Sequence, residues 1–125
     1  MKVLLGVIFN SLFLICYAAQ AAPSDYEQEY YRKINSDYLM ADKELNHIYT
    51  IQLQEYKKEG AEFYGQTQSR DVYLKKSQLA WIKMRDASCD YETYESRTGT
   101  GFAAIYEKCL LDKTNERIKY LRLNN

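Results

Sequence analysis

The chain has 125 residues, 13 of them tyrosine, and its 17 basic and 17 acidic side chains give a formal net charge of +0. A chain of this length can bury one small hydrophobic core, and a balanced charge supplies no field of one sign to attract nucleic acid or anionic lipid. The composition therefore predicts one small domain and argues against a basic nucleic-acid-binding protein.

The N-terminus has the three regions of a secretory signal peptide. Lys2 precedes an apolar run at 3–16, and Ala19-Gln20-Ala21 follows as a cleavage pattern. An apolar run of about 14 residues is short for a membrane span. We predict cleavage after Ala21, a single domain over 22–125 without integral membrane insertion, and a periplasmic or secreted location. Lys2 leaves with the signal, so 16 basic and 17 acidic side chains remain, a net charge near −1.

The first predicted helix runs over residues 25–59, with Ser24 or Asp25 as its N-cap. Side chains suited to burial recur along it every three or four positions, which is typical of a helix with one buried face. They are Tyr31, Ile34, Tyr38, Ala41, Leu45, Ile48, Gln52 and Tyr56. The pattern predicts a long N-terminal helix that packs on one side.

A loop is predicted where Gly60 and Gly65 enclose two aromatic residues, Phe63 and Tyr64. Aromatic residues in a connection either fold back beneath the bundle or offer a partner protein an apolar surface to bury. The first is the expected arrangement, and the second makes Phe63 and Tyr64 candidate partner-binding residues.

Two more helices are predicted on either side of a turn-forming segment at 96–101. The second helix runs from about Ser69 to about Glu95, and the third opens after Gly101 and ends in a polar tail. The second has two apolar sides, which predicts that it is the middle member of a three-helix bundle. One side holds Val72, Leu79, Ile82 and Cys89, and the other Tyr73, Ala80, Trp81, Met84 and Tyr91. The third helix presents Phe102, Ile105, Tyr106, Cys109, Leu110, Ile118 and Leu121.

Cys89 and Cys109 lie at equal distances on either side of Gly99. If the chain folds back at Gly99, they face each other across an antiparallel helix pair and can form a disulfide, which would stabilise the fold by about 3 kcal/mol. Disulfides persist in oxidising compartments, in agreement with a signal peptide. The predicted fold is an all-α three-helix bundle: a clasped helical hairpin, 69–123, and the long N-terminal helix.

Residues that could support catalysis are few. His47 is the only histidine of the chain, so a histidine-rich zinc site cannot form and a serine triad would depend on that one residue. Asp86, Asp90 and Glu92 gather near Cys89, but paired carboxylates need a cleft, for which a slim bundle has little volume. We predict a protein that is not an enzyme, without catalytic residues, cofactor or metal.

Trp81, Arg85 and Cys89 follow one another at intervals of four residues, and Asp86 adjoins Arg85. An arginine one helical turn from a tryptophan can lay its guanidinium on the indole and reach a carboxylate or a carbonyl of a neighbouring helix. Tryptophan and arginine also dominate binding hot spots. We favour the structural role, because Arg85 is one helical turn from the predicted disulfide and is therefore held close to the core.

Three ordered motifs connect the chain to a known family. Residues 80–89 fit A-W-x-x-[YFM]-R-D-x-x-C, and the third helix fits C-L-x-x-x-T-x-x-R-x-x-x-L from Cys109 through Thr114 and Arg117 to Leu121. The first helix fits Y-x-x-A-D-x-x-L-N-x-x-Y with Tyr38, Ala41, Asp42, Leu45, Asn46 and Tyr49. Over about 30–121 the chain resembles the lysozyme inhibitor LprI-like family, although it lacks a further cysteine pair that many members carry in the first helical region.

This resemblance implies an exported, mostly helical bacterial domain and, for some members, inhibition of lysozyme. The leading hypothesis is a periplasmic protein that blocks a muramidase or another peptidoglycan-degrading enzyme by occupying its cleft. Such an inhibitor needs a rigid protrusion, and the clasped turn at 96–102 is the first candidate. Its candidate contact residues are Arg97, Thr98, Thr100 and Phe102.

Two other functions fit the same sequence. One is an immunity protein that neutralises a cell-wall or membrane toxin of a rival bacterium in the periplasm. The other is a structural or stress-related envelope protein whose tyrosines contact peptidoglycan or another subunit. The sequence leaves the target and the oligomeric state open.

Overall fold

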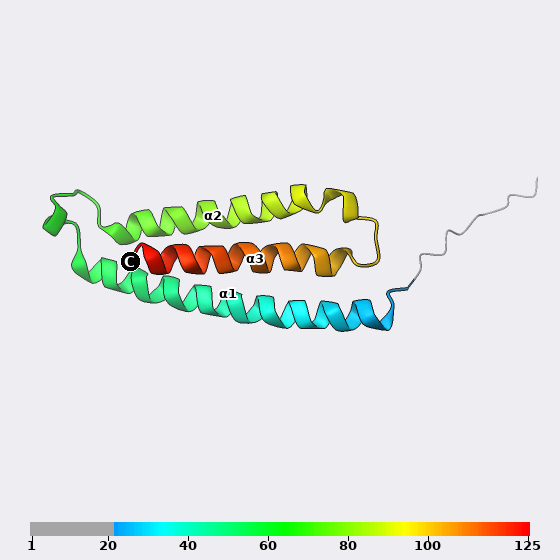
Figure 1. Cartoon of the computed structure of the whole chain (residues 1–125). Helices are drawn as coiled ribbons and strands as arrows, with labels where there is room; N and C mark the ends of the chain where they lie inside the picture. The colour runs from blue at the N-terminus through cyan, green and yellow to red at the C-terminus, as the bar shows by residue number, and fades with distance from the viewer. Residues whose placement is uncertain (1–21) are drawn as a thin grey trace, which may run out of the picture.

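A computed structural model describes residues 22–125, which form three helices joined by two short connections (Figure 1). The helices are α1 (Asp25–Glu59), α2 (Arg70–Glu92) and α3 (Phe102–Leu123), and one 3-10 turn stands in each connection, η1 (Glu62–Tyr64) and η2 (Tyr94–Ser96). Residues 22–125 contain no strand. The predicted all-α bundle is confirmed. The predicted signal peptide, 1–21, lies outside the described residues.

The start of α1 is closed by a capping box. The backbone N–H of Glu27 donates to Ser24 Oγ at 3.2 Å, and the backbone N–H of Ser24 donates to Glu27 Oε2 at 2.7 Å. A helix N-terminus leaves four N–H groups without helical partners, and this exchange satisfies one of them while fixing the entry of the chain. Ser24 is therefore the N-cap, and α1 has the predicted bounds.

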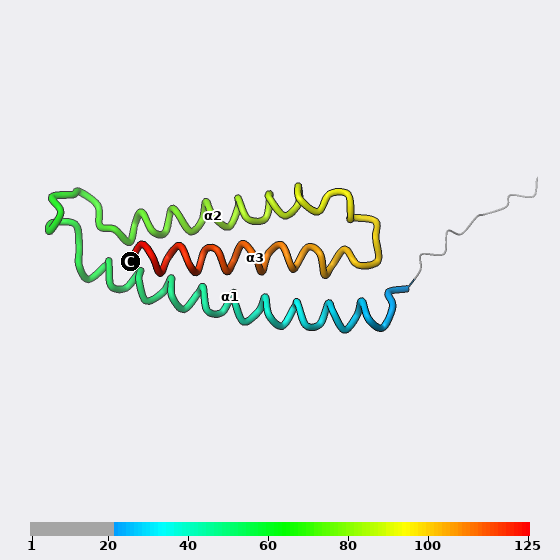
Figure 2. Tube along the Cα trace, viewed as in Figure 1, coloured from blue at the N-terminus to red at the C-terminus, as the bar shows by residue number. Residues whose placement is uncertain are grey.

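The three helices pack against one another as a bundle. Although α3 is drawn between α1 and α2 in the view of Figures 1 and 2, α2 contacts α1 at least as extensively as it contacts α3. Of the three helix pairs, α1 and α3 make the most extensive contact. The prediction that the second helix is the middle member is therefore wrong.

The hydrophobic core lies mainly between α1 and α3. Its centre consists of Ala41 and Leu45 of α1 with Ile118 and Leu121 of α3. These four residues were all expected on buried faces. Five partly buried side chains complete the cluster: Ile48, Tyr49, Leu74, Trp81 and Leu111. Only Leu74 and Trp81 come from α2.

Helix α2 buries polar groups and exposes apolar ones. Its buried side chains are those of Gln78, Arg85 and Cys89. The larger apolar side chains expected on its two buried sides are 54–83% exposed: Tyr73, Leu79, Met84 and Tyr91. The prediction of two buried apolar sides is therefore wrong. Because α1 and α3 fill the core between them, α2 contacts both helices along one narrow face and leaves its other sides in solvent. Ile105 of α3, also expected to be buried, is 45% exposed.

Candidate functional site

The connection between α1 and α2 lies at one end of the bundle, here called the loop end (residues 60–73) (Figure 1), and it carries two exposed aromatic residues. Phe63 is 79% exposed and Tyr64 58% exposed, and their rings meet edge to face with centroids 4.8 Å apart. The expectation that these rings fold back beneath the bundle is therefore wrong. The reason is local: both belong to η1, whose short turn points away from the three helix ends.

Two glycines set the path of this connection. Gly60 has φ 73° and ψ −167°, a conformation open essentially to glycine alone, and Gly65 caps η1 in the left-handed region at φ 62°. Around them, the N–H of Gly60 donates to Tyr56 O at 3.1 Å and the N–H of Gln66 donates to Ala61 O at 3.1 Å. The aromatic pair is thus held on a defined backbone turn.

A hollow of about 510 Å³ opens beside the aromatic pair. It combines aromatic rings with amide and guanidinium groups, and it is lined by Gly60, Ala61, Tyr64, Gln66, Gln68, Arg70 and Tyr73. The guanidinium of Arg70 lies 4.2 Å from the centroid of the Tyr56 ring and donates to Asn124 O at 2.6 Å. Sequence reasoning missed Arg70 and Tyr73, because only the fold brings the start of α2 beside this connection.

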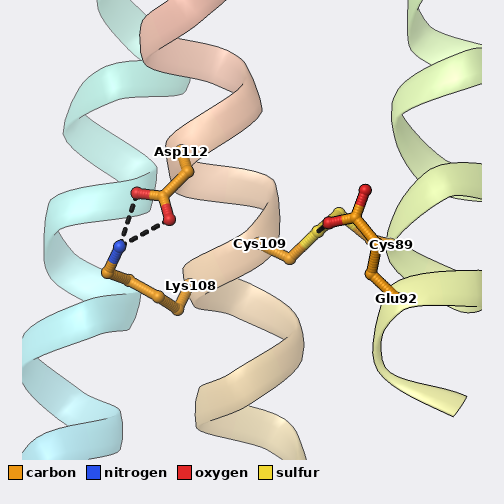
Figure 3. Close-up of polar contacts among 5 residues, drawn as sticks. All are labelled: Cys89, Glu92, Lys108, Cys109 and Asp112. Atoms are coloured by element: carbon orange, nitrogen blue, oxygen red, sulfur yellow. Dashed lines mark hydrogen bonds and ion pairs between the residues drawn. A yellow bond between two sulfur atoms is a disulfide. The ribbon is translucent and has the colours of Figure 1, made fainter.

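The turn between α2 and α3 lies at the opposite end of the bundle, here called the turn end (residues 93–102) (Figure 1). The disulfide predicted there is confirmed: Cys89 and Cys109 are bonded, and their Cα atoms are 5.7 Å apart. Figure 3 shows it joining α2 to α3, with the Glu92 carboxylate 3.6 Å from Cys109 Sγ. Glu92 also pairs with Lys113 at 2.8 Å. On the other side of α3, Lys108 pairs with Asp112 (Figure 3).

The polar side chains predicted to contact a partner at the turn end are largely engaged within the chain. Arg97 pairs with Asp90 at 2.7 Å, and the hydroxyl of Thr100 donates to Glu27 Oε1 at 2.9 Å. The backbone N–H of Ser24 and the Thr100 hydroxyl both stabilise the ionised carboxyl, so the pKa of Glu27 lies below its ordinary value of 4.5. Thr98 is exposed. Phe102 is half-buried, with its ring 5.7 Å from that of Tyr106.

The chain matches the family model described as lysozyme inhibitor LprI over residues 16–121. The chain belongs to this family. An uncharacterized protein of Rhizobium meliloti (strain 1021) is 32% identical over 91 residues, which cover 70% of this chain and 66% of that protein. The chain thus spans somewhat less than two thirds of this curated relative. No solved structure matches it significantly.

The motifs that carry the LprI resemblance meet in the middle of the bundle. Arg85 is buried, its guanidinium lies 5.1 Å from the centroid of the Trp81 ring, and it pairs with Asp86 at 2.8 Å. The predicted carboxylate partner is thus the adjacent residue on the same helix. Arg117 approaches Trp81 from α3, with 5.7 Å between guanidinium and ring centroid. The positions in α1 divide between the core and the surface: Ala41, Leu45 and Tyr49 pack in the core, and Asn46 donates to Asp42 at the surface.

Arg117 is a buried cation held by neutral groups. Its Nε donates to Gln78 Oε1 at 3.0 Å, and a terminal nitrogen donates to Ser77 Oγ at 2.9 Å. The ring of Tyr120 lies 5.0 Å from its guanidinium. Burial disfavours the charged form and lowers the pKa of Arg117. Sequence reasoning placed Arg117 in a motif but did not predict its burial, since arginine is rarely buried without a charged partner.

Among residues 22–125, no three histidine, cysteine, aspartate or glutamate side chains gather in a way that could hold a metal ion. His47 is exposed on α1. No helix of this part of the chain is both long and apolar enough to span a membrane.

Proposed function

We propose that this protein is an exported inhibitor that blocks a lysozyme-like enzyme by placing one end of the bundle in the cleft of that enzyme. The observation that carries the proposal is the match to the lysozyme inhibitor LprI family over 16–121. That family description favours an inhibitor over an immunity protein or an envelope structural protein. Export rests on the N-terminal signal pattern and on the Cys89–Cys109 disulfide, which requires an oxidising compartment.

The loop end is the contact surface that we propose first. Aromatic side chains supply much of the binding energy at protein interfaces, because each buries a large area at a small cost in conformational entropy. Phe63 and Tyr64 stand at the tip of the bundle, exposed and backed by a hollow that could receive a side chain of the enzyme. Inhibition by occupation of a cleft needs this shape and no chemistry.

The clasped turn is the second candidate surface. It is narrow and braced by the disulfide, and Thr98 is exposed. However, Arg97 already has a carboxylate partner in Asp90, and Thr100 has one in Glu27. An enzyme that bound Arg97 or Thr100 would have to replace those contacts, so we expect a smaller gain in binding energy from this end.

The test is inhibition of purified muramidases by the purified protein. Animal-type, goose-type and bacterial lysozymes are assayed on peptidoglycan with micromolar protein, and inhibition of at least one of them is expected. Phe63→Ala/Tyr64→Ala should weaken that inhibition by about 30-fold or more, which is the size of a hot spot. Leu39→Ala is the matched control, because Leu39 is as exposed as Tyr64, at 58%, but lies on the side of α1. Full activity of every enzyme in the presence of the protein would overturn the proposal.

A further inference from the structure

One side of α2 carries a row of exposed residues, although the hydroxyl of Ser77 at the edge of this row accepts a hydrogen bond from Arg117 of α3. The row, here called the α2 stripe, consists of Tyr73, Ser77, Ala80, Met84, Ala87 and Tyr91. Its members follow one another at intervals of four and three residues, the spacing that keeps side chains on one face of a helix. Its three large members are 54%, 54% and 83% exposed, while the same helix buries Gln78 and Arg85.

The order of large and small residues along this row is nearly the same in both directions. Reversal about Ile82 places Tyr73 opposite Tyr91, Ser77 opposite Ala87, and Ala80 opposite Met84. In an antiparallel helix pair, each residue meets the one at the mirrored position of the other helix. We propose that two copies of this chain associate through their α2 stripes in this antiparallel register, which forms a symmetric dimer.

The side chains suit such a pairing. Three small residues let two helix backbones approach, and Met84 can fill the space above Ala80 of the second copy. The two tyrosine pairs then close the contact at both ends of a stripe about 27 Å long, at 1.5 Å per residue. This burial supplies the favourable free energy that α2 does not obtain within its own bundle.

The charged residues beside the α2 stripe both attract and repel the second copy. Lys76 would lie near Asp90 of the second copy, an attraction that occurs twice in a symmetric dimer, although Asp90 also pairs with Arg97. Lys83 would lie near Lys83 of the second copy on the symmetry axis, a repulsion that occurs once. Removal of this repulsion by Lys83→Gln should therefore tighten the dimer.

The antiparallel register has a structural consequence. Arg70 at the start of α2 comes opposite Tyr94 of the second copy, so the loop end of one copy lies beside the turn end of the other. Each end of the dimer then presents both candidate contact segments, and the dimer has two equivalent binding ends. The dimer contact shares Tyr73 with the hollow of the loop end, but the association of two copies can be measured without any enzyme and so does not rest on the proposed inhibition.

The first test is the mass in solution of the purified protein, measured by sedimentation velocity from 1 to 100 µM. A dimer is expected, and Met84→Glu should raise its dissociation constant by about 100-fold or more, because a charge would be buried against Ala80 of the second copy. Leu79→Glu is the matched control: Leu79 is 55% exposed on α2 but lies outside the stripe. A monomer at all concentrations would overturn the proposal, and so would equal effects of the two variants.

The second test determines the register in which the two α2 helices pair. Ala80→Cys and Met84→Cys proteins are oxidised separately and as a mixture, with the native disulfide verified by mass. The antiparallel register predicts efficient cross-links between the two variants in the mixture and weak cross-links within either variant alone. Cross-links that form only within each variant would indicate parallel helices and would overturn the proposed register.

Discussion

The two ends of the bundle are fastened by different means, and the difference separates rigidity from availability. At the turn end, a disulfide joins Cys89 to Cys109, and the charged groups of Arg97 and Glu27 are satisfied within the chain. At the loop end, backbone conformation at two glycines holds the connection, and Phe63 and Tyr64 stay exposed. The end expected from the sequence to meet a partner is therefore the more strongly braced, and the other end offers more surface to bury.

The largest expected effect is on the turn end, from removal of its covalent bond. Cys89→Ala/Cys109→Ala should lower the free energy of unfolding by about 3 kcal/mol, because the unfolded chain regains the entropy that the closed loop removed. Urea unfolding followed by circular dichroism measures the change, and reduction of the wild-type protein should reproduce it. An unchanged midpoint would mean that the apolar contacts of α3 alone hold the turn end.

The loop end should be more sensitive to backbone conformation. Gly60→Ala is expected to cost about 2 kcal/mol, because alanine is strained at φ 73° and ψ −167° although nothing lies within 4 Å of its added methyl group. Gly101→Ala at the turn end is the control, since its φ of −84° suits any residue, and a cost below about 1 kcal/mol is expected. Thermal unfolding measures the loss of stability in both variants. Equal losses would contradict the difference that we infer between the two ends.

A smaller effect is expected from the ion pair of the turn end. Arg97→Ala should change the free energy of unfolding by less than about 1 kcal/mol, since Arg97 and Asp90 are both about half exposed. If the loop end is the contact surface, the same variant should leave inhibition of a sensitive muramidase within about threefold of wild type. A loss of inhibition as large as that of Phe63→Ala/Tyr64→Ala would move the contact surface to the clasped turn.

The smallest expected effect is on the pH dependence of stability at the turn end. Glu27 has a lowered pKa in the folded protein, so its contribution to stability is present above the ordinary value of 4.5 and is lost as the pH falls through the folded-state pKa. Glu27→Gln should therefore lower the melting temperature slightly at pH 7 and make little difference at pH 3. Glu29→Gln, on the solvent face of the same helix turn, is the control. A difference between Glu27→Gln and wild type that persists at pH 3 would contradict this account.

Local signals predicted the elements accurately. Ser24 as a candidate N-cap, the periodic residues of α1 and the glycines around both connections placed the starts of the helices within about a residue, whereas α2 ends at Glu92 and not near Glu95. The symmetry of Cys89 and Cys109 about Gly99 predicted the disulfide. These predictions hold because caps, turns and hairpin register depend on residues close together along the chain.

The surface of α2 and the position of Phe63 and Tyr64 could not be predicted in this way. Two apolar sides of a helix indicate two neighbours, but not whether those neighbours belong to the same copy of the chain. Likewise, an aromatic pair between glycines fits both a buried and an exposed loop. The burial of Arg117 depends on Gln78, Ser77 and Trp81, which lie more than thirty residues away in the chain.

The sequence by itself thus determined three helices, their boundaries, the disulfide and membership of the LprI family. Only the tertiary structure decided that α1 and α3 form the main helix pair, that α2 exposes the α2 stripe, and that the aromatic pair is exposed at the loop end. The physical reason is competition for one small core. Ala41 and Leu45 of α1 fill this core together with Ile118 and Leu121 of α3, and the apolar side chains that find no room between the two helices remain on the surface.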